Sequence, residues 1–185
     1  MAARVLAGAP ERFALAGLSM GGYLAFEIWR QAPARITRLA LLDTSARPDT
    51  PEQSANRLAA IEAAGRYDLA ALARSGLGQL LHPAAPVAVR DAVVAMSVRV
   101  GAETYCRQQR AIMARPDSRP LLSTIRVRTL VLVGEQDQLT PPAVAEEIAS
   151  GIAGSILHRV PACGHLATLE QPATVTDCLR EWLHA

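Results

Sequence analysis

The 185-residue chain contains no lysine, because arginine supplies all 19 of its basic residues. This absence excludes a Schiff-base lysine, a pyridoxal-phosphate site and the lysine of a Walker A phosphate loop. The arginines are scattered along the chain and form no basic stripe, which argues against a nucleic-acid partner. The formal net charge of +2 carries little information about other partners.

Cysteine is scarce, and long apolar runs are missing. Cys106, Cys163 and Cys178 are widely separated, and an odd count without Cys-x-x-Cys spacing argues against a disulfide framework or a zinc site. The apolar start, Met1 to Gly8, is too short for a signal peptide. No apolar run reaches the ~20 residues of a membrane-spanning helix. We therefore expect reduced thiols, a cytoplasmic location and no membrane partner.

What the chain does contain is an alternation of strand-like and helix-like segments. Such alternation predicts right-handed crossovers and a parallel sheet covered by helices on both faces. The predicted strands are residues 12–18, 36–42, 129–133 and 155–160, and the predicted flanking helices are residues 1–7, 20–31, 141–150 and 172–183.

Between the second and third strands the periodicity is helical for about 70 residues. The helical pieces are interrupted at Gly65, His82-Pro83, Gly101 and Arg115-Pro116. We interpret residues 50–125 as an inserted helical cap, and residues 1–49 and 126–185 as the α/β core. In the cap, Tyr105, Met96 and Met113 either face a substrate chamber or pack between helices, and helical spacing favours packing.

The sequence GLSMGG, Gly17 to Gly22, lies between a predicted strand and a predicted helix. Gly-x-Ser-x-Gly in this position is typical of a nucleophile elbow, in which Ser19 occupies a strained turn. Small residues two before and two after the serine, Gly17 and Gly21, are expected to prevent clashes. The motif alone is only moderately specific, since glycine and serine also serve ordinary turns.

A nucleophilic serine needs a histidine base, and the chain has four histidines. His82 precedes a proline in the cap, His158 lies inside the fourth strand, and His184 is next to the C-terminal residue. His165 follows the last strand, at the carboxyl edge of the sheet that also carries the elbow. Catalytic groups gather at this edge in parallel sheets, so His165 is the predicted base.

An acid is expected to orient the histidine, and three carboxylates are candidates. Asp137 follows the third strand at the same edge. Asp43 follows the second strand, where a turn or capping role is favoured over an acid role. Glu135 is either a rival acid or a solvated loop charge. Ser19, Asp137 and His165 occur in the Ser…Asp…His order of the α/β-hydrolase fold.

The stretches GLSMGGYLAFEIWRQAPARI, TLVLVGEQDQLTPP and VPACGHLATLEQP resemble the signature segments of α/β-hydrolase-fold serine hydrolases, within the small capped esterase and lactonase-like group. The resemblance covers most of the chain from Phe13 onward. It implies a three-layer, mostly parallel sheet formed by the family's strands five to eight. Ser19 would be the nucleophile, Asp137 the acid, His165 the base and the Met20 N–H an oxyanion donor, without metal or cofactor.

The chain also departs from the family's pattern, which has three or four strands and a second oxyanion-donor loop before the elbow. We therefore expect a chain that lacks the N-terminal strands of a longer product. The strand at residues 13–18 would then be an exposed apolar edge, which favours homo-oligomers.

The predicted function is acyl-enzyme hydrolysis of a small-molecule ester, thioester or lactone. The alternatives are a non-catalytic domain that acts in association, and a peptidase of the same fold.

Overall fold

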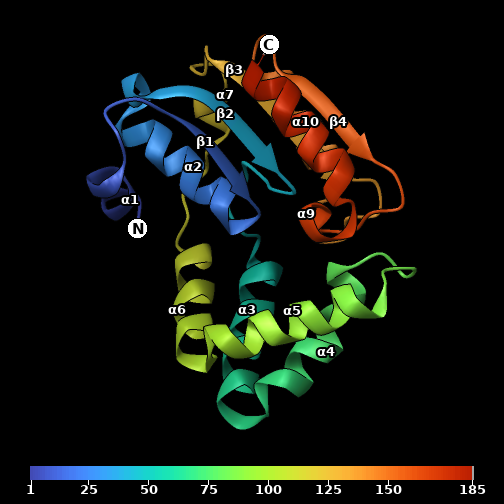
Figure 1. Cartoon of the computed structure of the whole chain (residues 1–185). Coiled ribbons are helices and arrows are strands. Elements are labelled where there is room, and N and C mark those ends of the chain that lie inside the picture. The colour runs from blue at the N-terminus through green and yellow to red at the C-terminus, as the bar shows by residue number, and fades with distance from the viewer. Residues whose placement is uncertain (185) are drawn as a thin grey trace.

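The computed structural model describes residues 1–184, and its centre is a four-stranded parallel sheet in the order β1-β2-β3-β4 (Figure 1). Leu42 pairs in register with Leu18 on one side and with Leu132 on the other. The carboxyl ends of the first three strands therefore lie side by side at one edge of the sheet. The strands are β1 (Phe13–Leu18), β2 (Ile36–Leu42), β3 (Arg128–Gly134) and β4 (Ile156–Val160).

The two central strands are buried on both faces, as their continuous apolar sequences require. In β2, Leu39 and Leu41 point into one apolar cluster, whereas Ala40 and Leu42 point into the other. Strand β3 alternates in the same way between the two clusters. The sheet therefore has two separate apolar cores, one under each helical layer.

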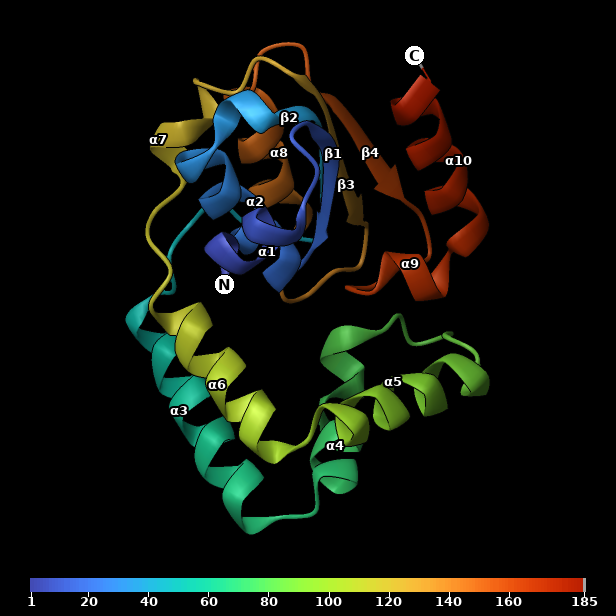
Figure 2. The same ribbon diagram turned by 60° about the vertical axis from the view of Figure 1, so that its left-hand side comes forward.

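Helices cover both faces of the sheet, which confirms the predicted three-layer α/β fold (Figure 2). One face carries α1 (Ala2–Gly8), α2 (Met20–Gln31), α7 (Arg119–Leu122) and α8 (Pro142–Gly151). The other carries α9 (Ala167–Glu170) and α10 (Pro172–His184). A single 3-10 turn, η1 (Pro33–Arg35), leads into β2.

Four further helices lie beyond the carboxyl ends of the strands, away from the two apolar clusters (Figures 1 and 2). The first begins with a capping box, in which the Thr50 hydroxyl accepts from the Gln53 N–H and the Gln53 side chain accepts from the Thr50 N–H. Gly101, at a φ of 76°, separates the last two. These helices are α3 (Pro51–Arg66), α4 (Leu69–Leu80), α5 (Val87–Val100) and α6 (Ala102–Met113).

We call α3 to α6 and their connections the cap. The domain boundaries near residues 50 and 125 stay a prediction.

Strand β1 lies at one edge of the sheet and pairs with β2. Ala14 and Ala16 are exposed on it, whereas Phe13 and Leu15 are half-buried. Homo-oligomerisation through this edge stays a prediction. None of the helices within residues 1–184 combines the length and apolar character that crossing a bilayer requires.

Candidate active site

Ser19 lies between the end of β1 and the start of α2, in a backbone conformation that a residue with a side chain rarely adopts. Its φ is 52° and its ψ is −115°. The Ser19 N–H donates to the Leu42 carbonyl at 2.9 Å, and the Thr44 hydroxyl donates to the Ser19 carbonyl at 2.8 Å. The end of β2 therefore holds the strained turn in place from both sides of the residue.

The glycines around Ser19 differ in whether the structure has room for a Cβ at their positions. A Cβ on Gly17 would overlap the Gly21 carbonyl, and a Cβ on Gly22 would overlap the Thr44 side chain. Apart from its chain neighbours and the backbone of its own helix, a Cβ on Gly21 would meet no heavy atom of residues 1–184 within 4 Å. The expectation that Gly21 relieves a clash is therefore wrong, because the crowded side of α2 is the one that carries Gly22.

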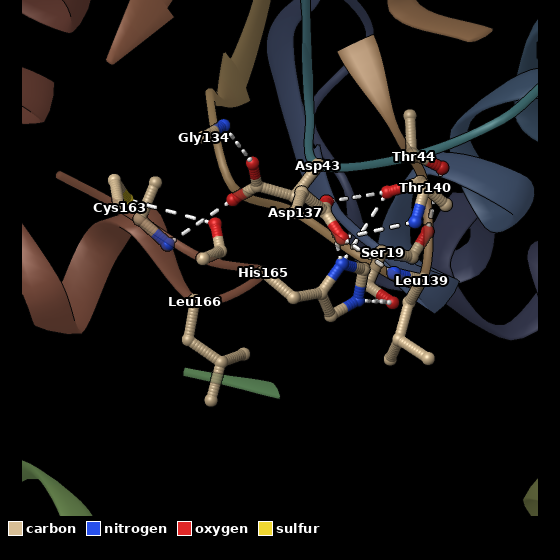
Figure 3. Close-up of polar contacts among 12 residues, drawn as sticks. Ser19, Asp43, Thr44, Gly134, Asp137, Leu139, Thr140, Cys163, His165 and Leu166 are labelled. Atoms are coloured by element: carbon tan, nitrogen blue, oxygen red, sulfur yellow. Dashed lines mark hydrogen bonds and ion pairs between the residues drawn. The ribbon is translucent and has the colours of Figure 1, made fainter. Parts of the chain in front are cut away.

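His165 reaches Ser19 from the loop between β4 and α9 (Figure 3). Its Nε2 lies 2.7 Å from Ser19 Oγ, although 146 residues separate the two in the chain. The ring is almost completely buried, with 3% of His165 exposed. Of the other histidines, His82 accepts the Ala84 N–H on Nδ1, His158 lies half-buried in β4 and His184 is exposed near the chain end.

Asp137 lies after β3 and contacts the opposite nitrogen of the same ring. Its Oδ2 is 2.8 Å from His165 Nδ1, and its Oδ1 accepts the N–H groups of Leu139 and Thr140, each at 2.9 Å. Burial by itself would raise the pKa of this carboxyl. The hydrogen bond and the charge of His165, together with the Thr140 bonds, outweigh burial and lower the pKa. The carboxylate is thus held ionised next to the ring.

Thr140 is a contact that the sequence interpretation missed. Its hydroxyl donates to Asp137 Oδ2 at 2.7 Å and lies 3.3 Å from His165 Nδ1. The sequence does contain a signal for this contact. Thr140 comes three residues after Asp137 and just before Pro141, a spacing that is typical of capping hydrogen bonds. Thr140 fixes the carboxylate rotamer that faces the imidazole.

Asp43 is not the histidine's partner, and it is more than a turn residue. It is fully buried at a φ of 44°, and its two oxygens accept the N–H groups of Gly134 at 2.9 Å and Ala167 at 3.1 Å. Burial raises the pKa of Asp43 to about 7, although these two N–H bonds work in the opposite direction. Asp43 therefore joins the end of β3 to the start of α9, directly after the His165 loop.

Glu135, the remaining acid candidate, is exposed beside the sheet edge. Its backbone N–H donates to the Val160 carbonyl at 3.0 Å, which pairs the ends of β3 and β4. The His165–Asp137 contact uses the carboxylate two residues later, so the structure brings Ser19, His165 and Asp137 together and leaves Glu135 in solvent.

Cysteine chemistry is disfavoured around this site. Burial and the nearby carboxylates raise the pKa of the Cys163 thiol to about 12, so this cysteine stays protonated and a poor nucleophile. Within residues 1–184, no group of three or more His, Cys, Asp or Glu side chains is arranged to hold a metal ion.

Helix α2 begins directly after the elbow, and the Gly22 N–H in its first turn donates to the Ser19 carbonyl at 2.9 Å. Met20 follows Ser19 directly as the first residue of this 12-residue helix. Its N–H has no hydrogen-bond acceptor among the described residues. An unpaired N–H at a helix N-terminus can stabilise negative charge on a neighbouring atom.

Comparison with known proteins gives a consistent assignment. The model of the Alpha/beta hydrolase family matches residues 2–177. A thermophilic esterase from Thermogutta terrifontis superposes with a TM-score of 0.86 at 36% identity, over 94% of this chain and 65% of that one. A hydrolase from Pseudomonas aeruginosa PA01 superposes with a TM-score of 0.85 at 30% identity, over 99% and 69%.

An enol-lactonase from Burkholderia xenovorans LB400 is also similar, with a TM-score of 0.82 at 28% identity, over 95% of this chain and 66% of that one. The present chain thus spans about two thirds of the length of these structures. The family match covers β1 to β4, the cap and the first half of α10, so it extends beyond the three signature segments. The chain belongs to the alpha/beta hydrolase family.

Proposed function

We propose that the chain is a serine hydrolase that cleaves a carboxylic ester, thioester or lactone through an acyl-enzyme intermediate. The observation that carries the proposal is the unbroken hydrogen-bonded series from Ser19 Oγ through both nitrogens of His165 to Asp137 Oδ2. A hydroxyl, an imidazole and a buried carboxylate in this order are the parts that acyl transfer requires.

In the first half of the reaction, Ser19 Oγ attacks the substrate carbonyl carbon while its proton passes to His165 Nε2. Asp137 accepts the Nδ1–H bond, which selects the tautomer whose Nε2 is free to take that proton, and it stabilises the imidazolium that results. The Met20 N–H would donate to the carbonyl oxygen as negative charge develops there. The carbon–oxygen or carbon–sulfur bond then breaks, and His165 returns the proton to the leaving alcohol or thiol.

In the second half, a water molecule attacks the acyl-enzyme carbonyl and gives its proton to His165 Nε2. The ester bond to Ser19 breaks, and the proton returns to Oγ, so a carboxylic acid leaves and the enzyme is regenerated. The similarity to proteins described as an esterase and an enol-lactonase supports oxygen esters as the substrate class.

A fluorophosphonate probe tests the proposal, because it phosphonylates an activated serine. We expect labelling of the wild-type chain at Ser19, and hydrolysis of a short p-nitrophenyl ester. Ser19→Ala should abolish both, whereas Ser75→Ala, on an exposed turn of α4, should change neither. Labelling that survives in Ser19→Ala would refute the assignment of the nucleophile. Turnover of amino-acyl amides in preference to esters would favour the peptidase alternative.

A second candidate, a non-catalytic domain that acts in association, is supported by the edge position of β1. An edge strand offers unpaired N–H and C=O groups to another chain. Size-exclusion chromatography of the same samples separates the two candidates. A stable oligomer without labelling supports the association candidate, and a labelled species of any size supports the hydrolase.

A further inference from the structure

The loop that carries His165 is held by a series of backbone hydrogen bonds. Four consecutive backbone N–H groups, residues 164–167, each donate to an acceptor outside this loop segment. The Gly164 and Leu166 N–H groups donate to Glu170 Oε1 at 3.0 and 3.3 Å, and the His165 N–H donates to the Leu80 carbonyl at 2.9 Å. The Ala167 N–H donates to Asp43 Oδ2 at 3.1 Å.

One of these acceptors, Glu170, also binds the cap. Its second oxygen, Oε2, accepts the His82 N–H at 2.7 Å, across 88 residues of sequence. One carboxylate therefore bonds to N–H groups on both sides of the catalytic histidine and to the cap segment Leu80–His82. That segment in turn supplies the acceptor for the histidine's own N–H.

The two segments also touch directly. A Cβ on Gly164 would overlap the backbone of Leu80–His82, including the His82 nitrogen. Gly164 is therefore a glycine because the cap backbone approaches it closely. Contact and hydrogen bonds together make this junction the place where a displacement of the cap would reach His165.

We propose that Glu170 is a positioning residue that couples the docking of the cap segment Leu80–His82 to the placement of His165 against Ser19. The inference rests on the proposed function, in which His165 is the base. When the cap segment is docked, Glu170 and Leu80 together hold the histidine loop. When the segment undocks, the His165 N–H loses its acceptor, and the 2.7 Å contact with Ser19 Oγ loosens.

The chemistry of the side chain suggests a variant that separates its two roles. Glutamate accepts all three N–H bonds because neither of its oxygens carries a proton. In Glu170→Gln, the amide oxygen can still accept from Gly164 and Leu166, but the NH2 group then faces the His82 N–H, donor to donor. This variant therefore releases the cap while it keeps the bonds to the histidine loop. Glu170→Ala releases both.

The test is the rate of fluorophosphonate labelling, measured at several probe concentrations so that the maximal rate and the apparent probe affinity are obtained separately. We expect the maximal rate to fall about tenfold in Glu170→Gln, the equivalent of one hydrogen bond to a charged group. In Glu170→Ala it should fall about a hundredfold, as misplacement of a catalytic group does. The apparent affinity should stay within about twofold of the wild type in Glu170→Gln.

The matched control is Glu146→Gln on α8, which removes an exposed ion pair with Arg159 and should label like the wild type. A double variant distinguishes an effect that acts through His165 from a merely structural effect. If Glu170 acts through His165, adding Glu170→Gln to Asp137→Asn should cost much less than tenfold, since the imidazole is already misplaced. Full additivity in the double variant would overturn the proposal.

Amide hydrogen exchange provides a readout independent of activity. In Glu170→Gln, exchange should accelerate in both segments 80–84 and 163–167, while the β2 and β3 segments stay protected. Gly164→Ala, which displaces the cap by overlap and leaves Glu170 intact, should accelerate the same two segments.

The possible failures are distinguishable. If wild-type Ser19 is not labelled, the proposed function fails, and exchange alone decides whether the two segments are coupled. If Ser19 is labelled and Glu170→Gln matches the wild type in rate, the coupling is disproved. Faster labelling in Glu170→Gln would also overturn the inference, because it would mean that the cap segment obstructs the serine and does not position its base.

Discussion

The α/β core and the cap differ in how much apolar surface each of them buries. In the core, β2 and β3 have fully or almost fully buried side chains on both faces, and most of the buried side chains of the protein belong to their two clusters. The four cap helices bury few residues and leave large apolar side chains in solvent. The exposed ones include Leu58, Tyr67, Val87, Met96, Val98 and Val100.

Polar contacts attach the cap to the core. Asp49, just before α3, has a buried carboxylate that pairs with Arg57 of α3 at 2.6 Å and with Arg115, after α6, at 2.5 Å. The Arg115 guanidinium also lies over the Tyr23 ring of α2, 4.3 Å from its centroid. One carboxylate thus joins the chain's entry into the cap to its exit, and Glu170 attaches the far end of the cap.

The difference between the apolar core and the cap attached by polar contacts corresponds to two different structural roles. The core places the hydroxyl, the imidazole and the carboxylate next to one another, as the proposed acyl transfer requires. The cap is attached to the core through a few directional contacts. Variants that weaken either region should therefore produce effects of different size and kind.

The largest expected effect is a core truncation. Leu132→Ala in β3, where the leucine is 0% exposed, should lower the free energy of unfolding by about 4 kcal/mol, within the range for a buried leucine that leaves a cavity. The matched change Leu58→Ala in the cap, at 57% exposed, should shift it by less than about 0.5 kcal/mol. Urea unfolding monitored by circular dichroism measures both. Equal losses in the two variants would contradict the contrast between core and cap.

An intermediate effect is expected at the junction. Asp49→Asn should cost about 2 kcal/mol, below the ~3–5 kcal/mol of a fully buried pair because Arg57 is partly solvated. Asp177→Asn, which removes an exposed pair with Arg180, is the control and should cost no more than about 0.5 kcal/mol. Limited proteolysis should cut Asp49→Asn near residues 47–50 or 114–118 before it cuts the core. Cleavage at the same sites and rates as in the wild type would show that Asp49 does not anchor the cap.

An effect of a different kind, a pH dependence of stability, is expected in the core alone. The pKa of Asp43 is about 7 in the folded chain, because burial disfavours its charge, and about 4 in the unfolded chain. The folded state therefore binds the proton more tightly. The stability that this proton contributes is present below about pH 4 and is lost as the pH rises to about 7.

Asp43→Asn, which does not titrate, is the reference for this measurement. The free energy of unfolding of the wild type, relative to Asp43→Asn, should fall between about pH 4 and pH 7 by at most ~1.4 kcal/mol per pH unit, and should level off above pH 7. Denaturant unfolding at a series of pH values measures the difference. A constant difference across this range would mean that Asp43 is ionised throughout, with its two N–H bonds outweighing burial.

Much of the fold was predictable because it rests on local patterns. The apolar run of β3 and the two prolines at the start of α8 give clear signals, and the strands begin and end within about one residue of their predicted positions. The four-residue α9 was missed. The four-residue α7 was expected as the last helical piece of the cap, but it packs against the sheet. So few residues carry no hydrophobic period, and tertiary contacts stabilise such turns.

In the candidate site, too, some residues were predictable from the sequence and others were not. Ser19, Asp137 and His165 were identified from their places after parallel strands, because the carboxyl ends of such strands meet at one edge of the sheet. The sequence analysis missed the contact of Thr140 with Asp137, the bridging role of Asp43 and the bond of Glu170 to the cap. Their partners are backbone N–H groups and side chains whose proximity depends on how loops pack.

The sequence by itself determined the order of strands and helices and the edge at which polar side chains gather, since periodicity and chain direction depend on near neighbours. Only the tertiary structure decided which nitrogen of His165 faces Ser19 and which faces Asp137, that Thr140 bonds to this carboxylate, and that Glu170 bonds to the cap. Those choices are hydrogen bonds between groups up to 146 residues apart, and their geometry exists only once both cores have packed.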